Sequence, residues 1–284
     1  HVVSFDLLHN RVIGNSMEPR GCWAEWVGGR CHVAVSGQGV WGLRNELAKS
    51  YGKPRGKFRV TTPDVGGGFG MKGMLYPEYF VVAEAARMTG HPVRWMSDRT
   101  EAMLTDTAGR DLLARVELGF DASHRITAYR LDVLSNLGAY NSTFAQLIQS
   151  ELLSKVFTGP YDIRNGHLRV RGIYTNTAPV DAYRGAGRPE AIMTLERAMD
   201  SAARQLGVDP WDLRRRNFIA AFPYRTPGRS VYDCGDFPRV LNRAQAEADA
   251  KGFGLRREKA AKAGKLRGMG IAFYIESILG DENE

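Results

Sequence analysis

The stretch Lys57–Gly73, KFRVTTPDVGGGFGMKG, joins a strand pattern to a loop of glycines that leads toward a helix. Its first residues, Lys57–Thr62, alternate polar and apolar side chains, as a half-buried strand does. Gly66–Gly70 then places four glycines in five positions, so the backbone can adopt positive φ and approach a ligand closely. Successive unhindered N–H groups in such a loop can form a concavity that binds anions. Pro77 follows where a helix can begin, since the N–H that proline lacks has no helical partner there.

Strand and helix patterns surround this stretch without the repeated β-α-β order of a parallel sheet, which predicts an α+β fold with mixed sheets and packed helices. Strands are predicted at Cys31–Ser36, Pro92–Ser97, Gly166–Thr175 and Gly268–Glu276, together with a hairpin of Arg110–Phe120 and Arg125–Ser135. Helices are predicted at Val40–Tyr51, Glu78–Met88, Arg188–Leu206 and Pro210–Arg216, more weakly over residues 144–156, and twice between residues 238 and 267.

The composition of the 284 residues is that of a globular chain, with 43% apolar and 25% charged residues. Of the formal net charge of +8, six charges come from Lys251–Arg267, which holds seven basic residues and one acidic residue. A solvated helix explains that segment better than a nucleic-acid surface does. Three cysteines and six scattered histidines show no pattern of a disulfide framework or a zinc site. No apolar run approaches the roughly 18 residues that span a bilayer, so we expect a soluble chain.

The glycine-rich loop also satisfies the dinucleotide-binding pattern G-x-G-x-x-G through Gly68, Gly70 and Gly73, with Asp98 as the later acid. Two details argue against a nicotinamide cofactor. The preceding strand alternates, whereas the first strand of a dinucleotide-binding fold is buried on both faces and continuously apolar. The helix begins at Pro77, four residues too late for its N-terminal amides to face a pyrophosphate.

A second candidate loop, Thr175–Glu190 (TNTAPVDAYRGAGRPE), precedes the strongest helix pattern of the chain. Arg184 and Arg188 bracket Gly185–Gly187, so forked guanidinium donors stand beside small residues that allow close approach. The start of the helix adds partial positive charge. A solvent-exposed capping loop explains the segment equally well. A third stretch, Asn15–Gly21 (NSMEPRG), is predicted to be an ordered turn and by itself says little.

Four segments follow one another in a set order and spacing: Asn15–Trp26 (NSMEPRGCWAEW), Gln38, Val65–Lys72 (VGGGFGMK) followed by Pro77-Glu78, and Tyr174–Glu190 (YTNTAPVDAYRGAGRPE). Together they resemble the molybdopterin-binding large subunit of the molybdenum hydroxylases, the family of xanthine dehydrogenase, aldehyde oxidase and aerobic carbon monoxide dehydrogenase. The resemblance extends over residues 10–278.

The resemblance implies a specific chemistry. In this family a molybdenum atom held by a pterin dithiolene hydroxylates a carbon centre with oxygen derived from water, and electrons leave through two [2Fe-2S] clusters to FAD. The protein supplies no direct metal ligand, so none is expected here. Gln38 matches the glutamine that hydrogen-bonds an oxygen ligand of the metal. The other matching residues lie in the glycine-rich loop against the cofactor (Gly68, Phe69 and Gly70) and in the loop beside the metal (Arg184, Gly185 and Ala186).

Three departures from the family narrow the expected substrate. Purine-oxidising members carry a glutamate at the position of Gly73 and a phenylalanine at that of Ala186. Carbon monoxide dehydrogenases proper carry a copper-binding cysteine where this chain has Gly185. Purine hydroxylation and copper-dependent oxidation of carbon monoxide are therefore disfavoured, and the resemblance points to an aldehyde or an N-heteroaromatic substrate.

The general base of the family is a glutamate near the end of the large subunit, and it is expected beyond Glu284. Glu276 and Glu282 do not match its position and receive no catalytic role. The resemblance assigns residues 1–234 to a first molybdopterin-binding domain, and residues 235–284 to a helical linker and the truncated start of a second. We therefore expect an excerpt or one piece of a split subunit, inactive alone.

The family also implies partners. We expect an iron–sulfur subunit, an FAD subunit and the remaining part of the large subunit, in a cytoplasmic dimer of heterotrimers without nucleic acid or a membrane span. The pterin is expected in its cytosine dinucleotide form. Two alternatives stay open at this point: a nicotinamide-dependent dehydrogenase, and a non-catalytic assembly or binding module that uses Lys251–Arg267.

Overall fold

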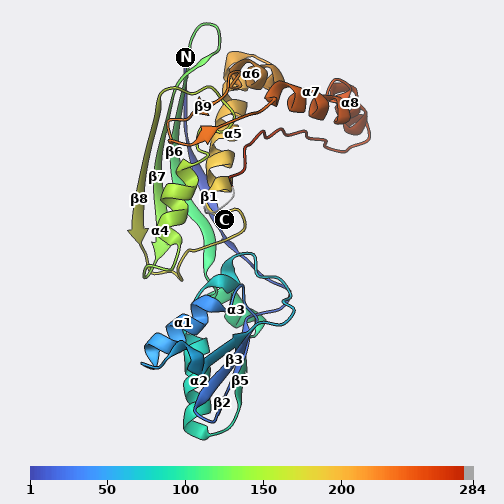
Figure 1. Ribbon diagram of the computed structural model, residues 1–284. Helices are drawn as coiled ribbons and strands as arrows, with labels where there is room; N and C mark the ends of the chain where they lie inside the picture. Colours follow the sequence, from blue (N-terminus) through green and yellow to red (C-terminus); the bar gives the residue numbers. More distant parts are fainter. Residues whose placement is uncertain (278–284) are drawn as a thin grey trace.

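A computed structural model describes residues 1–277 and shows two lobes, each built on its own four-stranded sheet (Figure 1). The small lobe comprises residues 14–107, and the large lobe comprises the strand that precedes them and the rest of the described chain. Each lobe has its own cluster of buried apolar side chains. Separate mixed sheets with helices packed on them confirm the predicted α+β class.

The sheet of the large lobe has the strand order β1-β6-β7-β8. Strand β6 (Ala108–Phe120) pairs antiparallel with both β1 (Val2–Ile13) and β7 (Ile126–Gly138), whereas β8 (Gly166–Tyr174) pairs with β7 in parallel. The inner face of β6 is apolar and packs beneath helix α5 (Arg188–Leu206). The predicted hairpin and the predicted helix are both confirmed, because each rests on a strict period of apolar residues.

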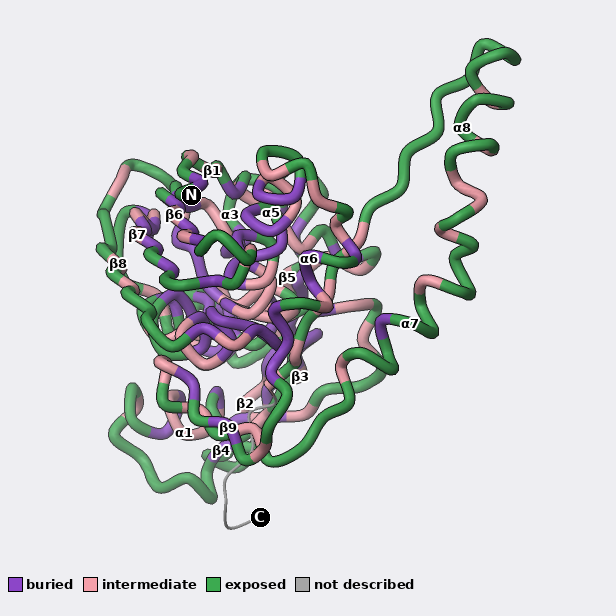
Figure 2. The backbone as a smooth tube through the Cα atoms, turned by 90° about the horizontal axis from the view of Figure 1, so that it is seen from above, coloured by how far each residue is buried: buried purple, intermediate pink, exposed green. Residues whose placement is uncertain are grey.

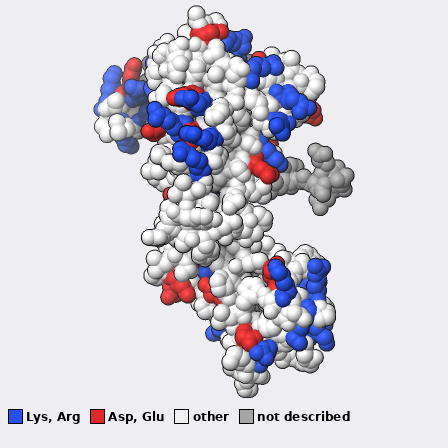
Figure 3. All heavy atoms as spheres, turned by 90° about the vertical axis from the view of Figure 1, so that its left-hand side faces the viewer, with Lys and Arg blue, Asp and Glu red and all other residues white. Residues whose placement is uncertain are grey.

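The outer face of this sheet is polar, and Figure 3 shows basic and acidic side chains mixed over it. Arg130 pairs with Glu117, while Arg169 and Arg171 both pair with Asp132. Opposite charges on neighbouring strands suit a sheet face that is in contact with water.

The sheet of the small lobe has the order β4-β3-β2-β5, formed by β2 (Gly21–Val27), β3 (Arg30–Val35), β4 (Phe58–Thr61) and β5 (Val93–Met96). Helix α1 (Trp41–Ser50) contacts β4, and helix α2 (Pro77–Thr89) lies on β2. Helix α2 begins at Pro77 as predicted, and it ends at the left-handed Gly90, a residue type that the sequence predicts as a helix C-cap. A short helix, α3 (Arg99–Thr105), leads back toward the large lobe.

The remaining helices belong to the large lobe or project from it. The weakly helical stretch is α4 (Ala145–Leu147), continued by a π turn. The sequence Asp209-Pro210 predicts an N-cap followed by the first residue of a helix, and α6 (Pro210–Asn217) begins there with Asp209 as its cap. Helices α7 (Phe237–Glu247) and α8 (Phe253–Lys262) extend away from the body of the molecule (Figure 2). Helix α8 buries no residue, so the basic segment is a solvated helix as predicted. Among residues 1–277, no helix has the length and apolar character that crossing a membrane requires.

The predicted strand Gly268–Glu276 is wrong: no strand forms there. The segment lies instead against α5 and α6, where Phe273 N–H donates to Glu196 (2.9 Å) and Ile271 C=O accepts from Arg214 (3.2 Å). Its backbone groups are satisfied by buried charged side chains rather than by a neighbouring strand. A second difference is β1, which spans 12 residues, whereas the sequence predicts only short strands and one helix in the first sixty residues. The predicted domain boundary after residue 234 falls just before α7 and stays a prediction.

Candidate cofactor-binding site

Gln38 follows strand β3 and places its side chain on the glycine-rich loop. Its Oε1 accepts a hydrogen bond of 2.8 Å from the N–H of Gly70. A Cβ atom at Gly68 would lie only 2.4 Å from the same oxygen, so the loop needs a glycine where Gln38 crosses it. Because the oxygen is used within the protein, the amide nitrogen of this exposed side chain remains available as a donor.

Phe69 occupies the tip of the loop in a left-handed backbone conformation, with φ of 54°. Such a conformation is uncommon and costly for a residue with a side chain. Gly67 and Gly70 flank it with φ of 94° and 101°. Phe69 is 41% exposed, so the strained backbone leaves an apolar residue accessible at the tip of the loop. This arrangement suits contact with a ligand that lies against the loop.

The loop around Arg184 meets the glycine-rich loop directly. The N–H of Arg184 donates to the carbonyl of Phe69 over 2.9 Å. A Cβ atom at Gly70 would lie 2.7 Å from the carbonyl oxygen of Ala182, so the two backbones approach as closely as glycine permits. The structure therefore brings the predicted residues Gln38, Phe69 and Arg184 together in one chain of contacts that runs from the small lobe to the large lobe.

The other predicted residues of the second loop form the turn into α5. Gly185, Ala186 and Gly187 all have positive φ, of 89°, 40° and 86°. Gly187 packs so closely on the π turn that a Cβ atom there would lie 2.3 Å from the carbonyl oxygen of Ile148. Arg184 itself is exposed at the rim of this turn. Its guanidinium can therefore reach an anionic group outside the protein surface.

Arg188, the second arginine of this loop, does not share that role. Its Nε donates to Glu276 over 2.8 Å, and its side chain is 12% exposed. Glu276 is thus the ion-pair partner of Arg188. Glu282, the other glutamate considered in the sequence, lies outside the described residues.

The sequence gives no signal for Arg110, whose side chain binds the backbone of the second loop. Its guanidinium donates to the carbonyl of Tyr183 (3.0 Å) and to that of Arg184 (2.7 Å). Arg110 and Asp111 both have positive φ, of 63° and 61°, so the strand is locally distorted where this side chain leaves it. The alternation of this strand is regular only from Ala114 onward, and the irregular residues before it do not show which side chain leaves the strand.

Two titratable groups lie buried beside Arg110. Burial raises the pKa of Glu190, although Arg110, 3.5 Å away, lowers it in part. Burial, and then the charge of Arg110, lowers the pKa of His9 to about 4, so this imidazole is neutral at neutral pH. The ring of His9 instead forms a hydrogen bond of 2.9 Å with Thr194. At neutral pH the His9 ring therefore adds no positive charge beside Arg110.

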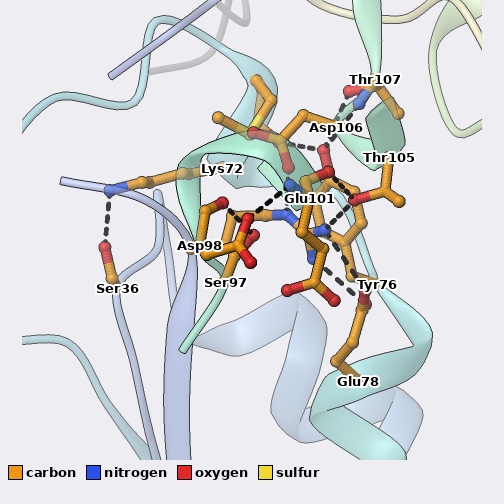
Figure 4. Close-up of polar contacts among 12 residues, drawn as sticks. Ser36, Lys72, Tyr76, Glu78, Ser97, Asp98, Glu101, Thr105, Asp106 and Thr107 are labelled. Atoms are coloured by element: carbon orange, nitrogen blue, oxygen red, sulfur yellow. Dashed lines mark hydrogen bonds and ion pairs between the residues drawn. The ribbon is translucent and has the colours of Figure 1, made fainter. Parts of the chain in front are cut away.

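The dinucleotide alternative finds no support in the structure. Asp98 caps helix α3 by accepting from the N–H of Glu101 over 2.7 Å (Figure 4). Gly73 ends a separate 3₁₀ turn, Met71–Gly73, so the glycine-rich loop does not open helix α2. Within residues 1–277, no group of three or more His, Cys, Asp or Glu side chains is arranged to hold a metal ion.

A cavity of about 250 Å³ adjoins Gln38. Trp41, Leu75 and Phe144 give part of its wall an apolar character, and Gly73 contributes backbone. A Cβ atom at Gly73 would meet nothing closer than the side chain of Gln38 at 3.9 Å. The cavity therefore has room that a larger residue at position 73 would fill.

Comparisons with known proteins identify the family of this chain. Residues 1–218 match the family model described as molybdopterin cofactor-binding domain. The chain is 34% identical over 282 residues to the nicotine 6-hydroxylase large subunit of Paenarthrobacter nicotinovorans, which covers 98% of this chain and 34% of that protein. It is 32% identical over 287 residues to the carbon monoxide dehydrogenase large chain of Hydrogenophaga pseudoflava, covering 97% of this chain and 36% of that protein.

A solved structure shares the fold. Quinoline 2-oxidoreductase from Pseudomonas putida 86 superimposes with a TM-score of 0.89 at 30% identity, covering 93% of this chain and 34% of that chain. The present chain therefore spans about a third of the length of these relatives.

Proposed function

The chain belongs to the molybdopterin cofactor-binding family found in the large subunits of molybdenum hydroxylases, and from this premise we propose that its two joined loops form part of a molybdenum–pterin site. The observation that carries the proposal is the continuous contact from Gln38 through Gly70 and Phe69 to Arg184. The cofactor, when bound, supplies an oxidising centre that hydroxylates carbon with oxygen from water.

We assign the cofactor contacts to side chains and backbone that the fold leaves available. Gln38 would donate its amide N–H to an oxygen ligand of the metal, since its Oε1 is held by Gly70. The backbone of Gly68, Phe69 and Gly70 would lie against the pterin side of the group. The turn formed by Arg184, Gly185 and Ala186 would border the metal, where a guanidinium can stabilise developing negative charge.

We further propose that the substrate is an aldehyde or an N-heteroaromatic compound. The room beside Gly73 and the apolar wall of Trp41 and Phe144 suit a ring or a carbonyl compound better than a purine held by a carboxylate. At Gly185 a Cβ atom would lie 2.4 Å from Pro189, so a copper-binding cysteine has no space there. Two of the relatives are named for the N-heterocycles nicotine and quinoline.

The whole enzyme, in this proposal, assembles this chain with the rest of a large subunit, an iron–sulfur subunit and an FAD subunit, which carry the electrons away. The assembly is proposed to be a cytoplasmic dimer of heterotrimers, with the pterin as its cytosine dinucleotide. The general base is proposed to be a glutamate supplied from outside this chain.

The test is a metal and activity analysis of the intact complex. We expect close to one molybdenum per large subunit, together with reduction of an artificial electron acceptor by an aldehyde or an N-heterocycle. Full activity in a complex that contains no molybdenum contradicts the proposal. Tight binding of NADH to the chain, lost in Gly70→Val, would instead support the dehydrogenase alternative.

A further inference from the structure

The stretch Asn15–Gly21, which the proposed site leaves without a role, supplies the acceptor at the base of the glycine-rich loop. Oε2 of Glu18 accepts three hydrogen bonds: from Ser36 Oγ (2.7 Å), from the N–H of Gly66 (2.7 Å) and from Lys72 Nζ (2.9 Å). The N–H of Glu18 also donates to the carbonyl of Gly66 over 3.2 Å. One carboxylate thus joins both ends of the loop to the strand end that precedes Gln38.

Lys72 completes this cluster from inside the small lobe. Its side chain is 0% exposed, and its ammonium group also donates to Ser36 Oγ over 2.6 Å (Figure 4). The carbonyl of Lys72 accepts the N–H of Gln38 over 3.1 Å. Lys72 therefore binds Gln38 through its backbone carbonyl and binds Ser36, two residues before Gln38, through its side chain.

The charge state of the cluster agrees with its geometry. Burial alone would raise the pKa of Glu18, but the hydrogen bonds from Ser36, Lys72 and the N–H of Gly66 lower it below its ordinary value. A buried ammonium group needs such a partner, because an unpaired charge in the interior is strongly unfavourable. For stability alone, an apolar pair of similar volume would serve as well.

We propose that Glu18 and Lys72 are positioning residues, which fix the distance and orientation between the Gln38 amide and the Phe69–Gly70 backbone. The inference rests on the proposed molybdenum–pterin function. Glu18 binds Gly66 at the start of the loop and the Lys72 side chain at its end, and the Lys72 carbonyl binds the N–H of Gln38. While these bonds are intact, both ends of the loop keep their positions relative to Gln38. The loop is close-packed at this point, since a Cβ atom at Gly66 would lie 2.5 Å from the Glu18 side chain.

The test compares Glu18→Gln and Lys72→Met with Glu84→Gln in the intact complex. Glu84 is a matched control because it is also half of an ion pair in the small lobe, with Arg87, but lies on the exposed side of α2. The measurements are molybdenum per large subunit, the Mo(V) electron paramagnetic resonance spectrum, kcat per bound molybdenum, KM and the unfolding temperature.

We expect Glu18→Gln and Lys72→Met to lower kcat per molybdenum roughly ten- to a hundredfold, because a small displacement of a positioning group costs that much. KM should change far less, and the Mo(V) spectrum should shift. Glu84→Gln should leave all of these values as in the parent. Ser36→Ala removes one donor and keeps the ion pair, so it should act in the same direction to a smaller extent even if Lys72→Met does not fold.

Two outcomes would overturn the positioning role. The variant Gln38→Leu distinguishes them from a failure of the proposed molybdenum–pterin site. A normal spectrum and normal kcat per molybdenum in the Glu18, Lys72 and Ser36 variants, with only a lower unfolding temperature, would show a purely structural role. The same is true if Gln38→Leu alters the spectrum and those variants do not. If Gln38→Leu also leaves the spectrum and kcat unchanged, the proposed site itself is wrong.

Discussion

Among the described residues, five of the eight residues other than glycine that have positive φ lie at or beside the candidate site. Phe69 and Ala186 lie in the two loops, Arg110 and Asp111 lie directly beneath the second, and Asn15 begins the stretch that contains Glu18. Each costs on the order of 1 kcal/mol, so such strain persists only where the surrounding structure enforces it. Its concentration here supports a ligand-binding role for both loops.

The predicted site residues and the missed ones differ in whether the neighbouring sequence gives a signal for them. Phe69 and Arg184 stand in loops that local composition marks through their glycines, whereas Gln38 is predicted by the family resemblance alone. Arg110 and Lys72 act across long sequence separations through hydrogen bonds that depend on backbone geometry. Nothing in the residues around them indicates those bonds, which is why only the structure identifies them.

The crossing of Gln38 over Gly68 gives the first prediction. In Gly68→Ala the new methyl group would displace the flexible end of the Gln38 side chain, and Gly70 would lose its acceptor. We expect kcat per molybdenum to fall about tenfold, since the donor is misplaced rather than removed, with little change in the unfolding temperature. Gly56→Ala is the control, because a Cβ atom there meets nothing within 4 Å and Gly56 does not line the cavity beside Gln38. Equal kcat in both variants would show that Gln38 does not need this placement.

Arg110 gives the second prediction. Arg110→Met would leave two loop carbonyls and the buried Glu190 without their cation, so we expect a loss of about 3 kcal/mol in unfolding free energy, together with a lower molybdenum content. Adding Glu190→Gln removes the unpaired carboxylate and should restore much of the stability without restoring molybdenum. Arg115→Met, at an exposed position of the same strand, is the control. Restoration of both quantities by Glu190→Gln would mean that Arg110 only neutralises a charge.

At the scale of elements, the sequence predicts best where apolar residues keep a strict period and caps are local. Helix α5 begins and ends at the predicted residues, and Asp209 caps α6 as expected. The segment Gly268–Glu276 has the alternation of a strand, yet Glu196 and Arg214 take up its backbone groups. Those two residues lie in helices far earlier in the chain, so local alternation could not reveal the competition between a strand partner and a buried ion pair.

The packing of α5 on β1 gives a prediction for pH dependence. The pKa of His9 is about 4 in the folded chain, against 6.5 ordinarily, because the ring is buried and faces Arg110. Between these values the unfolded chain binds a proton that the folded chain does not, so stability falls as the pH falls. We expect His9→Gln to remove about 2 kcal/mol of the stability lost by the chain between pH 7.5 and pH 5. Urea unfolding at both pH values measures this.

The control for this prediction is His91→Gln, since His91 is exposed in the small lobe and should leave the pH dependence unchanged. An identical loss of stability in the parent and in His9→Gln would show that another group controls the response to acid.

At the scale of the whole molecule, the two lobes have separate cores and meet where their loops form the candidate site (Figure 1). The hydrogen bond from Arg184 to Phe69 crosses between the lobes, as does the packing of Gly70 on Ala182. Each loop is strained by itself and is held by its own lobe, through Arg110 on one side and Glu18 with Lys72 on the other. The relative placement of the lobes therefore sets the geometry of the site.

The excess positive charge lies on the projecting arm of α7 and α8. Removing charges from this arm tests whether they have a function apart from the candidate site. Helix α8 buries no residue, and Arg256 is already paired with Asp249, so neither core depends on its charges. A variant with Lys251, Lys259, Lys262 and Lys265 changed to glutamine should keep the unfolding temperature, the molybdenum content and kcat of the parent. Its weak retention on a nucleic-acid matrix should equal that of the parent at every salt concentration. Strong retention of the parent at low salt, falling steeply with ionic strength and lost in the variant, would instead favour the binding-module alternative, because phosphate contacts release counterions.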